Sequence, residues 1–352
     1  MGGAERQANL VACGLRALGH DVHYVTSRRR GWPGGLKTAS LDPQEVAEAS
    51  ARGADVIYVR DVLAVRKALE LGRLRGSVPV VVALYSGTQC TLLSRRQLAT
   101  YLRGQGAKAM VNYPLNRVPE FASTRVASRL AACVVAQTAE QSRLLRQNFG
   151  RSATIIPNGY DLSQCSPSVA PAARRYVTWI GKAYKRPDRF IRAAAALGPM
   201  DDVEYIMLGV EASQLPAGLA RLAESHGVRL AGEAPHERVD CVVGQSLVYV
   251  HTAEYEGFPN TFLEAWAHEV PVVSAGVDPD GVLSTTGSGV VCTGLEEMVR
   301  VLRELLADPD RRTEAGRAGR QHLVATHDLA ITSRAHELLF RRLVDSRSAG
   351  RG

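Results

Sequence analysis

Short apolar runs rich in β-branched residues alternate with amphipathic stretches along most of the chain. A stretch such as "AERQANLVACGLRAL" has apolar residues at the spacing of a helix. Strands that alternate with helices predict parallel sheets covered by helices on both faces, and near-continuous apolar strands fit such sheets. The sequence therefore predicts an α/β protein with doubly wound sheets. The expected strands are Val22–Thr26, Val56–Val59, Val78–Leu84, Ala132–Ala136, Ala153–Ile156, Tyr176–Ile180, Val203–Leu208, Val228–Leu230, Leu247–Val250 and Val270–Ser274.

The run "SQCSPSVAPAARR" at residues 163–175 interrupts this alternation. It is rich in Pro, Ser and Ala, as interdomain linkers often are. A chain of 352 residues is long enough for two domains. We therefore expect one Rossmann-like domain over 1–165 and a second over 166–325, facing each other across a cleft. From Leu295 onward we expect helices only, and we expect 326–352 to pack back toward the N-terminal domain.

The charge is unevenly distributed. Residues 1–165 contain 22 Lys and Arg against 11 Asp and Glu, whereas residues 166–352 contain 21 against 24. The basic half fits an anionic membrane surface, an anionic small molecule, or only a solvated arginine-rich surface. A nucleic-acid partner is not expected, because basic and aromatic residues form no recognisable binding signature.

The absence of some familiar signals limits the other possibilities. No run of eighteen apolar residues occurs, and "MGGAERQANL" is not a signal peptide. We therefore expect a cytoplasmic protein, with peripheral contact at the inner face of the membrane left open. The six cysteines lie far apart without a CxxC pair, so we expect reduced, mostly buried thiols and no zinc site.

Ligands of doubly wound sheets bind beyond the carboxyl ends of the strands, so the loops that follow strands are informative. The loop "GKAYKRPDRF" follows Tyr176–Ile180. Gly181 permits a tight turn, and Lys182, Lys185 and Arg186 precede the helix start at Pro187. Cations beside a helix N-terminus suit a diphosphate, although solvated surface lysines are an alternative.

The stretch "EYEGFPNTFLEAW" follows the apolar run at 247–250. Asn260 is a good N-cap, and Glu264 is then expected in the first turn, where the helix dipole stabilises a carboxylate by roughly 0.3–1 kcal/mol. That interpretation leaves Glu256 unexplained, because it precedes the helix. A carboxylate at this helix end can instead accept both hydroxyls of a ribose.

These motifs together resemble the retaining GT-B glycosyltransferases of family 4. The Glu-x7-Glu hallmark of that family is matched by Glu256 and Glu264 within "EGFPNTFLEAWA". Further similar segments are "GGAERQANLVACGLRALGHDVHYVT", "SATIIPNGYD" and "WIGKAYKRPDRFIRAAA", in the same order as in the family. The segment "PVVSAGVDPDGVL" resembles the subgroup that builds surface polysaccharides.

The resemblance implies a GT-B fold and assigns expected roles to residues. Glu264 would hold the donor ribose, and Glu256 would lie near the donor sugar. Lys185 would bind phosphate, whereas Lys182 stands where the family usually has arginine. The other donor-binding residues expected from the resemblance are Gly2, Gly3, Gly181, Arg186, Leu230, Ala231, Gly232, Gly257, Phe258, Pro259, Asn260 and Thr261.

The sequence also departs from the family at two places. Members often carry a His in the loop matched by Leu84–Thr88, which has none here, so either Tyr85 or Ser86 replaces it or the site is arranged differently. A buried strand normally precedes the Gly-Gly loop in the family, so we expect the native chain to begin upstream of Met1. The alternative is that Val22–Thr26 and its neighbours close the gap in the sheet. His251, at the end of a strand, is expected to be structural.

The expected reaction moves a sugar from a nucleoside diphosphate to an acceptor hydroxyl with retention, in polysaccharide or glycoconjugate synthesis. The partners would be the nucleotide sugar and a sugar or lipid-linked acceptor. No cofactor or metal is expected, because lysines can neutralise the diphosphate. The Asp278–Asp280 and Asp308–Asp310 pairs only resemble a metal motif, and the latter fits a turn with an N-cap.

A nucleotide-sugar epimerase or a non-catalytic nucleotide-sugar-binding protein could share the fold. A nicotinamide-dependent dehydrogenase would need GxGxxG after the first strand, which is absent, and a solute-binding protein would need an export signal.

Overall fold

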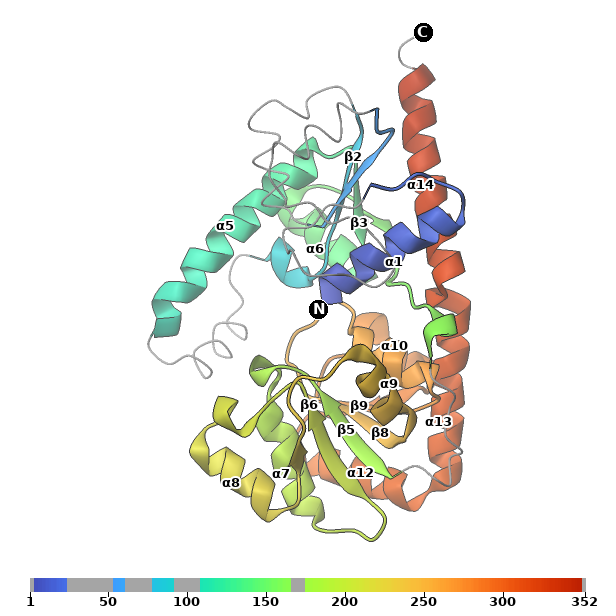
Figure 1. Ribbon diagram of the computed structural model, residues 1–352. Coiled ribbons are helices and arrows are strands. Elements are labelled where there is room, and N and C mark those ends of the chain that lie inside the picture. The colour runs from blue at the N-terminus through green and yellow to red at the C-terminus, as the bar shows by residue number, and fades with distance from the viewer. Residues whose placement is uncertain (1–2, 24–52, 61–77, 92–107, 166–174, 350–352) are drawn as a thin grey trace. The chain divides into compact units, whose positions relative to one another are not determined.

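The computed structural model describes residues 3–23, 53–60, 78–91, 108–165 and 175–349, in an arrangement of two α/β units (Figure 1). The first unit comprises residues 1–159 together with 328–352, and the second comprises residues 160–327. The chain therefore enters the second unit between Gly159 and Tyr160, and its last helix belongs to the first unit. Residues 166–174 of the expected linker lie outside the described residues.

In its described part, the first unit contains a parallel sheet with the strand order β1-β2-β3-β4. Its strands are β1 (Ile57–Val59), β2 (Val80–Ala83), β3 (Cys133–Ala136) and β4 (Thr154–Ile155). The register pairs Val81 with both Tyr58 and Cys133. All four residues of β2 are buried, as expected for a central strand of a parallel sheet. The helices of this unit are α1 (Gly3–Ala17), α5 (Lys108–Leu130), α6 (Ala139–Phe149) and α14 (Leu329–Ala349), with a 3-10 turn, η1 (Gly87–Cys90), after β2.

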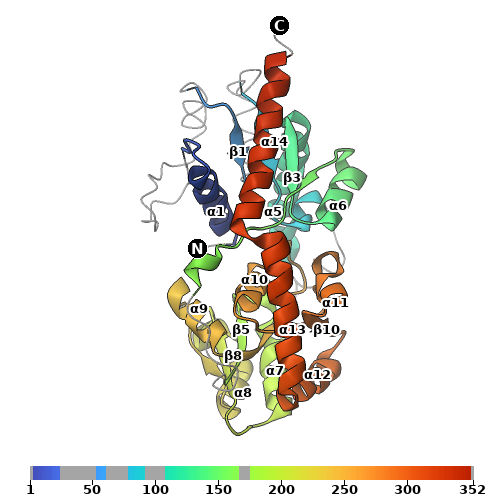
Figure 2. The ribbon, with the colours of Figure 1, turned by 90° about the vertical axis from the view of Figure 1, so that its right-hand side faces the viewer.

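Alternate residues of these strands pack on opposite faces of the sheet. Val80, Val82 and Val134 contact α5 and α6 through a cluster that includes Ala127 and Phe149. Val81, Ala83 and Val135 contact α14 on the other face, through Ala335, Leu339, Phe340 and Leu343. Figure 2 shows α14 running alongside β1, β3 and α1. Helix α14 thus supplies the layer that covers one face of the N-terminal sheet.

The second unit contains a larger parallel sheet, with the described strand order β10-β9-β8-β5-β6-β7. Its strands are β5 (Tyr176–Ile180), β6 (Glu204–Leu208), β7 (Arg229–Leu230), β8 (Ser246–His251), β9 (Val272–Ser274) and β10 (Gly289–Val291). Its α-helices are α7 (Pro187–Leu197), α8 (Ala217–Ser225), α9 (His236–Gly244), α10 (Asn260–Ala267), α11 (Val282–Thr286), α12 (Leu295–Ala307) and α13 (Pro309–His322). Short turns complete it: η2 (Leu162–Gln164), η4 (Ala183–Lys185), η5 (Ala212–Gln214), η6 (Pro279–Gly281) and the π-type turn η7 (Leu323–His327).

The two faces of this sheet are covered by different helices. Val177, Trp179 and Val248 pack with residues of α7, α8 and α12. On the other face, Tyr249 and Val272 pack with α10 around Trp266, while Tyr176 and Ile206 pack against α9. The predicted doubly wound α/β architecture is therefore confirmed.

Most expected strands appear, with ends shifted by one or two residues. Residues 24–26 of the expected strand Val22–Thr26 lie outside the described residues, and Val22 and His23 are not in a strand. The sequence prediction missed β10. It has only three residues, two of them Val, and follows Gly287 and Ser288, so its apolar signal is too short to separate from a loop. After Leu295 the described chain is helical, as predicted.

The cysteines are all free, as expected, but the expectation that most are buried was wrong. Cys90 and Cys292 are buried, Cys13, Cys133 and Cys165 are partly buried, and Cys241 is exposed. None of the described helices combines the length and the apolar character that a bilayer span would need.

Candidate functional site

The order in which the chain adds strands to the second sheet reverses between β5 and β8. From β5 the chain adds β6 and β7 on one side, and it then returns to add β8, β9 and β10 on the other. Strands β5 and β8 are parallel neighbours, so the loops that follow them leave the sheet at the same edge. Crevices at such switch points are the usual ligand sites of doubly wound sheets.

The two loops are joined there by an ion pair. Lys185 Nζ, from the loop after β5, lies 2.6 Å from Glu256 Oε1, from the loop after β8, and both side chains are largely buried. Burial lowers the pKa of Lys185, but the carboxylates of Glu256 and Glu264 outweigh it and raise the pKa above its ordinary value. Lys185 therefore provides a permanent positive charge at this edge of the sheet.

Glu264 is not where the sequence predicted it to be within its helix. Helix α10 begins at Asn260 with Pro259 as the N-cap, and no side chain caps it, so Asn260 as N-cap was wrong. The first turn of α10 contains no acidic residue, and Glu264 belongs to the second turn. Only 7% of Glu264 is exposed. Because the dipole effect falls off within the first turn, it does not account for a buried carboxylate here.

Buried polar side chains surround these carboxylates. The hydroxyl of Tyr249 donates to Thr261 Oγ1 at 2.8 Å and lies 3.3 Å from Nδ1 of His251. Burial raises the pKa of Tyr249, and the charges of Glu264 and Glu256 add to this effect. Burial and the nearby charge of Lys185 hold the pKa of His251 well below its ordinary value, so the ring is neutral at pH 7. His251 packs edge-on against Phe262, consistent with the structural role expected for it.

Glu254 links the same two loops at a second point. Its carboxylate pairs with Arg186 and, at 2.9 Å, with Arg189. Arg186 also makes a two-pronged pair with Asp188, both distances being 2.8 Å. The backbone of Arg186 is left-handed, with φ 59°, which is uncommon for a residue with a side chain. The partners of Glu254 could not be predicted from the sequence, because the two arginines lie far from it along the chain.

Lys182 is less enclosed than Lys185. It is exposed and pairs with Glu233, which is 72% exposed and follows β7. A pair as exposed as this contributes little to stability, so Lys182 remains available to a ligand.

Glycines allow the loops after β5, β6 and β7 to approach closely. A Cβ atom on Gly209, whose φ is 90°, would lie 2.4 Å from the carbonyl oxygen of Gly181. The amide of Gly209 donates to the carbonyl of Gly232 at 2.6 Å, and the amide of Gly232 donates to that of Val210 at 3.2 Å. Gly181 and Gly232, both candidate residues, are thus connected through Gly209, which the sequence analysis did not single out.

The Gly-Phe-Pro-Asn turn is anchored by its aromatic residue. Phe258 is buried, with its ring 4.6 Å from that of His327 and 6.3 Å from that of Trp266. Its side chain therefore belongs to the core behind α10. Gly257, Asn260 and Thr261 are partly buried around it.

Two parts of the expected site belong to the first unit. Gly2 lies outside the described residues, whereas Gly3 is exposed and begins α1. In the loop matched to the family's histidine, Tyr85 donates its hydroxyl to Glu120 Oε1 at 2.7 Å. Ser86 is the N-cap of η1, and its hydroxyl accepts from the amide of Thr88 at 3.2 Å.

The two Asp-Pro-Asp segments have local structural partners. Asp308 caps α13 by accepting from the amide of Arg311 at 2.9 Å, as predicted. Asp278 accepts from the amide of Leu283 at 2.8 Å and from the hydroxyl of Ser284 at 2.7 Å. Both aspartates therefore have a helix-terminus role.

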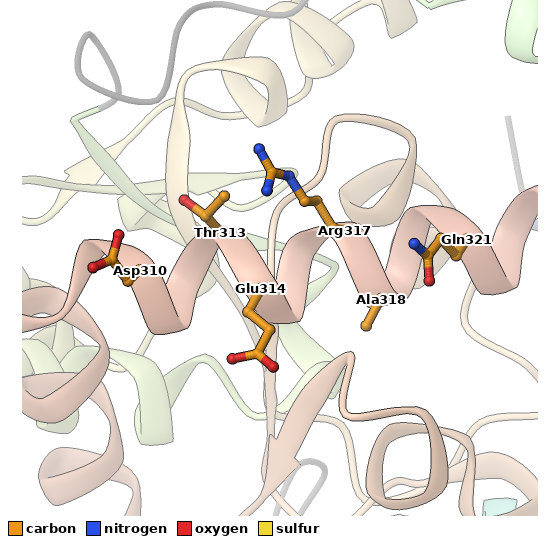
Figure 3. A pocket seen from close by; sticks show the side chains of 6 residues that line it. All are labelled: Asp310, Thr313, Glu314, Arg317, Ala318 and Gln321. Carbon is orange, nitrogen blue, oxygen red and sulfur yellow. The ribbon is translucent and has the colours of Figure 1, made fainter.

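A depression of about 530 Å³ lies along α13 and includes none of the candidate site residues (Figure 3). The residues that line it all come from one helix and point in different directions around it: Asp310, Thr313, Glu314, Arg317, Ala318 and Gln321. We do not assign a site there, because one helix cannot enclose a ligand.

Two doubly wound α/β units with parallel sheets are the fold of solved GT-B glycosyltransferase structures, and the chain has this fold. Residues 1–164 match the model of Glycosyltransferase Family 4, and residues 178–322 match that of Glycosyl transferases group 1. The second match contains both strand-end loops described above.

One named protein is similar to this chain in sequence, and several solved structures are similar to it in fold. A GDP-mannose-dependent monoacylated alpha-(1-6)-phosphatidylinositol monomannoside mannosyltransferase of Corynebacterium glutamicum is 28% identical over 211 residues, which are 52% of this chain and 55% of that protein. The chain thus aligns with about half the length of this relative. Sucrose-phosphate synthase of Thermosynechococcus elongatus has a similar structure, with a TM-score of 0.74 at 18% identity over 98% of this chain and 94% of that one. Anabaena HepE in complex with UDP and glucose gives 0.72 at 16% identity over 97% and 96%.

Proposed function

We propose that the chain transfers a sugar from a nucleoside-diphosphate sugar to an acceptor hydroxyl, with retention of configuration. The observation that carries this proposal is the charge arrangement at the β5/β8 switch point. There, Lys185 is paired with Glu256 and lies within the field of the buried Glu264. The relatives support the donor class, because one is named as GDP-mannose-dependent and another was solved with UDP and glucose.

In this proposal the nucleoside diphosphate leaves as an anion, and catalysis consists mainly in stabilising its developing charge. Lys185 remains protonated because its pKa is raised, so it can contact the diphosphate throughout the reaction. Lys182 is exposed and can turn from Glu233 toward the same oxygens. The N-terminus of α10 carries no acidic side chain in its first turn, so the positive end of the helix dipole can face phosphate.

The two carboxylates of the Glu-x7-Glu motif have different environments, and we assign them different tasks. Glu264 lies within α10 and is almost fully buried, which suits a fixed acceptor for the two ribose hydroxyls. Glu256 lies in the turn before the helix and is paired with Lys185. It can stabilise positive charge on the sugar ring when Lys185 shifts toward the diphosphate.

The acceptor is proposed to be a sugar or a lipid-linked glycan in the synthesis of a polysaccharide or glycoconjugate. The excess of 22 basic over 11 acidic residues in 1–165 suits peripheral contact with an anionic membrane surface on the cytoplasmic side. No metal or cofactor enters this proposal, because the lysines and helix amides supply the charge that the diphosphate needs.

Thermal-shift and turnover measurements with UDP-, GDP-, ADP- and dTDP-sugars test the proposal. A true donor should raise the melting temperature, because it binds only the folded state. It should then release nucleoside diphosphate slowly, and faster when glycan acceptors are added. If no sugar nucleotide shifts the melting temperature and none is consumed, the proposal is wrong. Release of an epimerised donor without transfer would replace it with the epimerase alternative.

A further inference from the structure

A second cluster of potential ligands lies in the same unit, at the opposite end of α10 from the candidate donor site. Cys165, Asp240 and His268 each offer one ligand atom, and these atoms all lie within 4.8 Å of one another. The three residues come from separate parts of the chain. The cysteine spacing alone therefore gave no sign of the cluster.

Regular structure fixes all three positions. Cys165 directly follows the turn η2 and is partly buried. Asp240, in the middle of α9, is 3% exposed, and His268, the C-cap residue of α10, is fully buried. Helices α9 and α10 pack together, as Figure 2 also shows. The ligand atoms are therefore held on elements that cannot easily separate.

The ring of His268 is oriented by its neighbours. Its Nε2 atom lies 2.7 Å from Asp240 Oδ1, whereas its Nδ1 edge faces Gly244, where a Cβ atom would come within 3.1 Å. The nitrogen that faces the cluster is thus Nε2. Tetrahedral zinc, with bonds of about 2.0–2.3 Å, separates its ligand atoms by roughly 3.3–3.7 Å. The Nε2–Oδ1 separation of 2.7 Å and the upper limit of 4.8 Å for the set lie on either side of that range.

The electrostatic surroundings favour a cation. The cluster lies at the C-terminal end of α10, which is the negative end of the helix dipole. That end already attracts one cation, because Arg320 donates to the carbonyl of Ala267 at 2.5 Å. Cys165 and Val239 pack at the margin of the apolar core around Trp266, so one side of the cluster is apolar. A nearby hydroxyl, that of Tyr160, lies 3.6 Å from Cys165 Sγ and can donate to a thiolate.

We propose that Cys165, Asp240 and His268 bind one zinc ion. The soft thiolate and the imidazole select a borderline-soft transition metal over magnesium or calcium. On binding, the Cys165 thiol releases its proton to water and a zinc–sulfur bond forms. The thiolate and the Asp240 carboxylate then neutralise the two charges of the ion. His268 coordinates through Nε2 with its ring proton on Nδ1, the metal bond replaces the present contact between Nε2 and Asp240, and water takes the fourth position.

The ion has a structural task. It joins the segment that enters the second unit after Gly159 to α9 and to α10, the helix that carries Glu264. The site is separate from the proposed transfer chemistry, and its test does not require the donor to be known.

Cobalt(II) added to the metal-free full-length chain provides the direct test. One equivalent should produce a thiolate-to-cobalt charge-transfer band together with visible bands of tetrahedral intensity, and zinc should displace both. Zinc should also raise the melting temperature of the native chain. Without a thiolate band on the native chain, or with metal bound at no fixed stoichiometry, the proposal is wrong.

Three variants locate the site. Cys165→Ser should abolish the charge-transfer band and weaken zinc binding at least tenfold, and Asp240→Asn should weaken it to a similar degree. Cys241→Ser is the matched control, because Cys241 is adjacent to Asp240 on α9 but exposed, and it should bind metal like the native chain. Loss of the band in Cys241→Ser, or its retention in Cys165→Ser, would overturn the assignment. If a variant fails to fold, carbamidomethylation of the native thiols, with and without zinc, asks whether the metal protects Cys165.

Discussion

Two loops of this molecule follow buried parallel strands, yet they satisfy their polar groups in opposite ways. In the loop after β2, Ser86 and Gln89 bond to the backbone of the loop itself, with Gln89 Oε1 accepting from the amide of Tyr85 at 2.8 Å. In the loop after β8, the partners come from another loop. Thr252 donates to the carbonyl of Lys185 at 2.7 Å, and both Glu254 and Glu256 pair with cations from the β5–α7 segment.

The difference separates a loop whose Ser86 and Gln89 bond to its own backbone from one whose charged side chains bond to another loop. The described part of the loop after β2, residues 84–91, contains no charged side chain. The loop after β8 contains two carboxylates, and both pair with cations from the β5–α7 segment. Keeping such charges partly buried is costly unless the pairs are well formed. We infer that the β8 loop bears this cost because a charged ligand exchanges partners with it. Single substitutions in the two loops and around them test this difference.

The largest effect is expected from Lys185→Ala. Removing the cation that faces the diphosphate should lower kcat/KM by about 100- to 1,000-fold, the range found when one charge-stabilising group is removed. Steady-state kinetics with the donor found by thermal shift provides the measurement. Arg192→Ala is the control, because Arg192 is exposed on the helix α7 that follows the same loop. Near-native kinetics in Lys185→Ala would show that the pair with Glu256 is only structural.

Most strands of the two sheets could be predicted from the sequence, but few of the side-chain contacts between the loops could. Tyr176–Ile180 was predicted with its observed limits, because five apolar or β-branched residues end at a glycine. The strand β10 was not predicted, because an edge strand of three residues gives only a short apolar signal. Lys185 and Glu256 could each be selected from their motifs. Their contact, and the partners of Glu254, could not, because strand order brings together residues that are far apart in sequence.

A somewhat smaller effect is expected from Glu264→Gln. If Glu264 accepts the ribose hydroxyls, loss of its charge should weaken donor binding by about 1.5–3 kcal/mol, since hydrogen bonds to charged groups have that strength. Calorimetric titration of donor or nucleoside diphosphate provides the measurement. Glu296→Gln is the matched control, because Glu296 is exposed in the first turn of α12, where its charge interacts with the helix dipole. Equal donor affinity in the two variants would reduce Glu264 to a structural residue.

Glu254→Gln should affect stability more than donor binding. Glu254 is only 12% exposed and faces Arg186 and Arg189, so loss of its charge should destabilise the second unit by about 1–2 kcal/mol. Donor affinity should fall threefold or less, because the proposal leaves Glu254 without a ligand contact. Chemical denaturation and calorimetric titration separate the two effects. Unchanged stability with a tenfold loss of affinity would place Glu254 in the donor site instead.

The smallest effect is expected from Ser86→Ala in the self-capped loop. Ser86 caps η1 through its hydroxyl, which accepts from the amide of Thr88 at 3.2 Å and from its hydroxyl at 2.9 Å. Loss of an N-cap typically costs about 1 kcal/mol, and the unfolding free energy of the first unit should fall by that amount. Because the hydroxyl is engaged in the cap, kcat/KM should change less than twofold. Stability that is unchanged, with activity lowered at least tenfold, would mean that Ser86 replaces the histidine that related glycosyltransferases carry in this loop. The two loops would then both serve the ligand, and the contrast between them would fail.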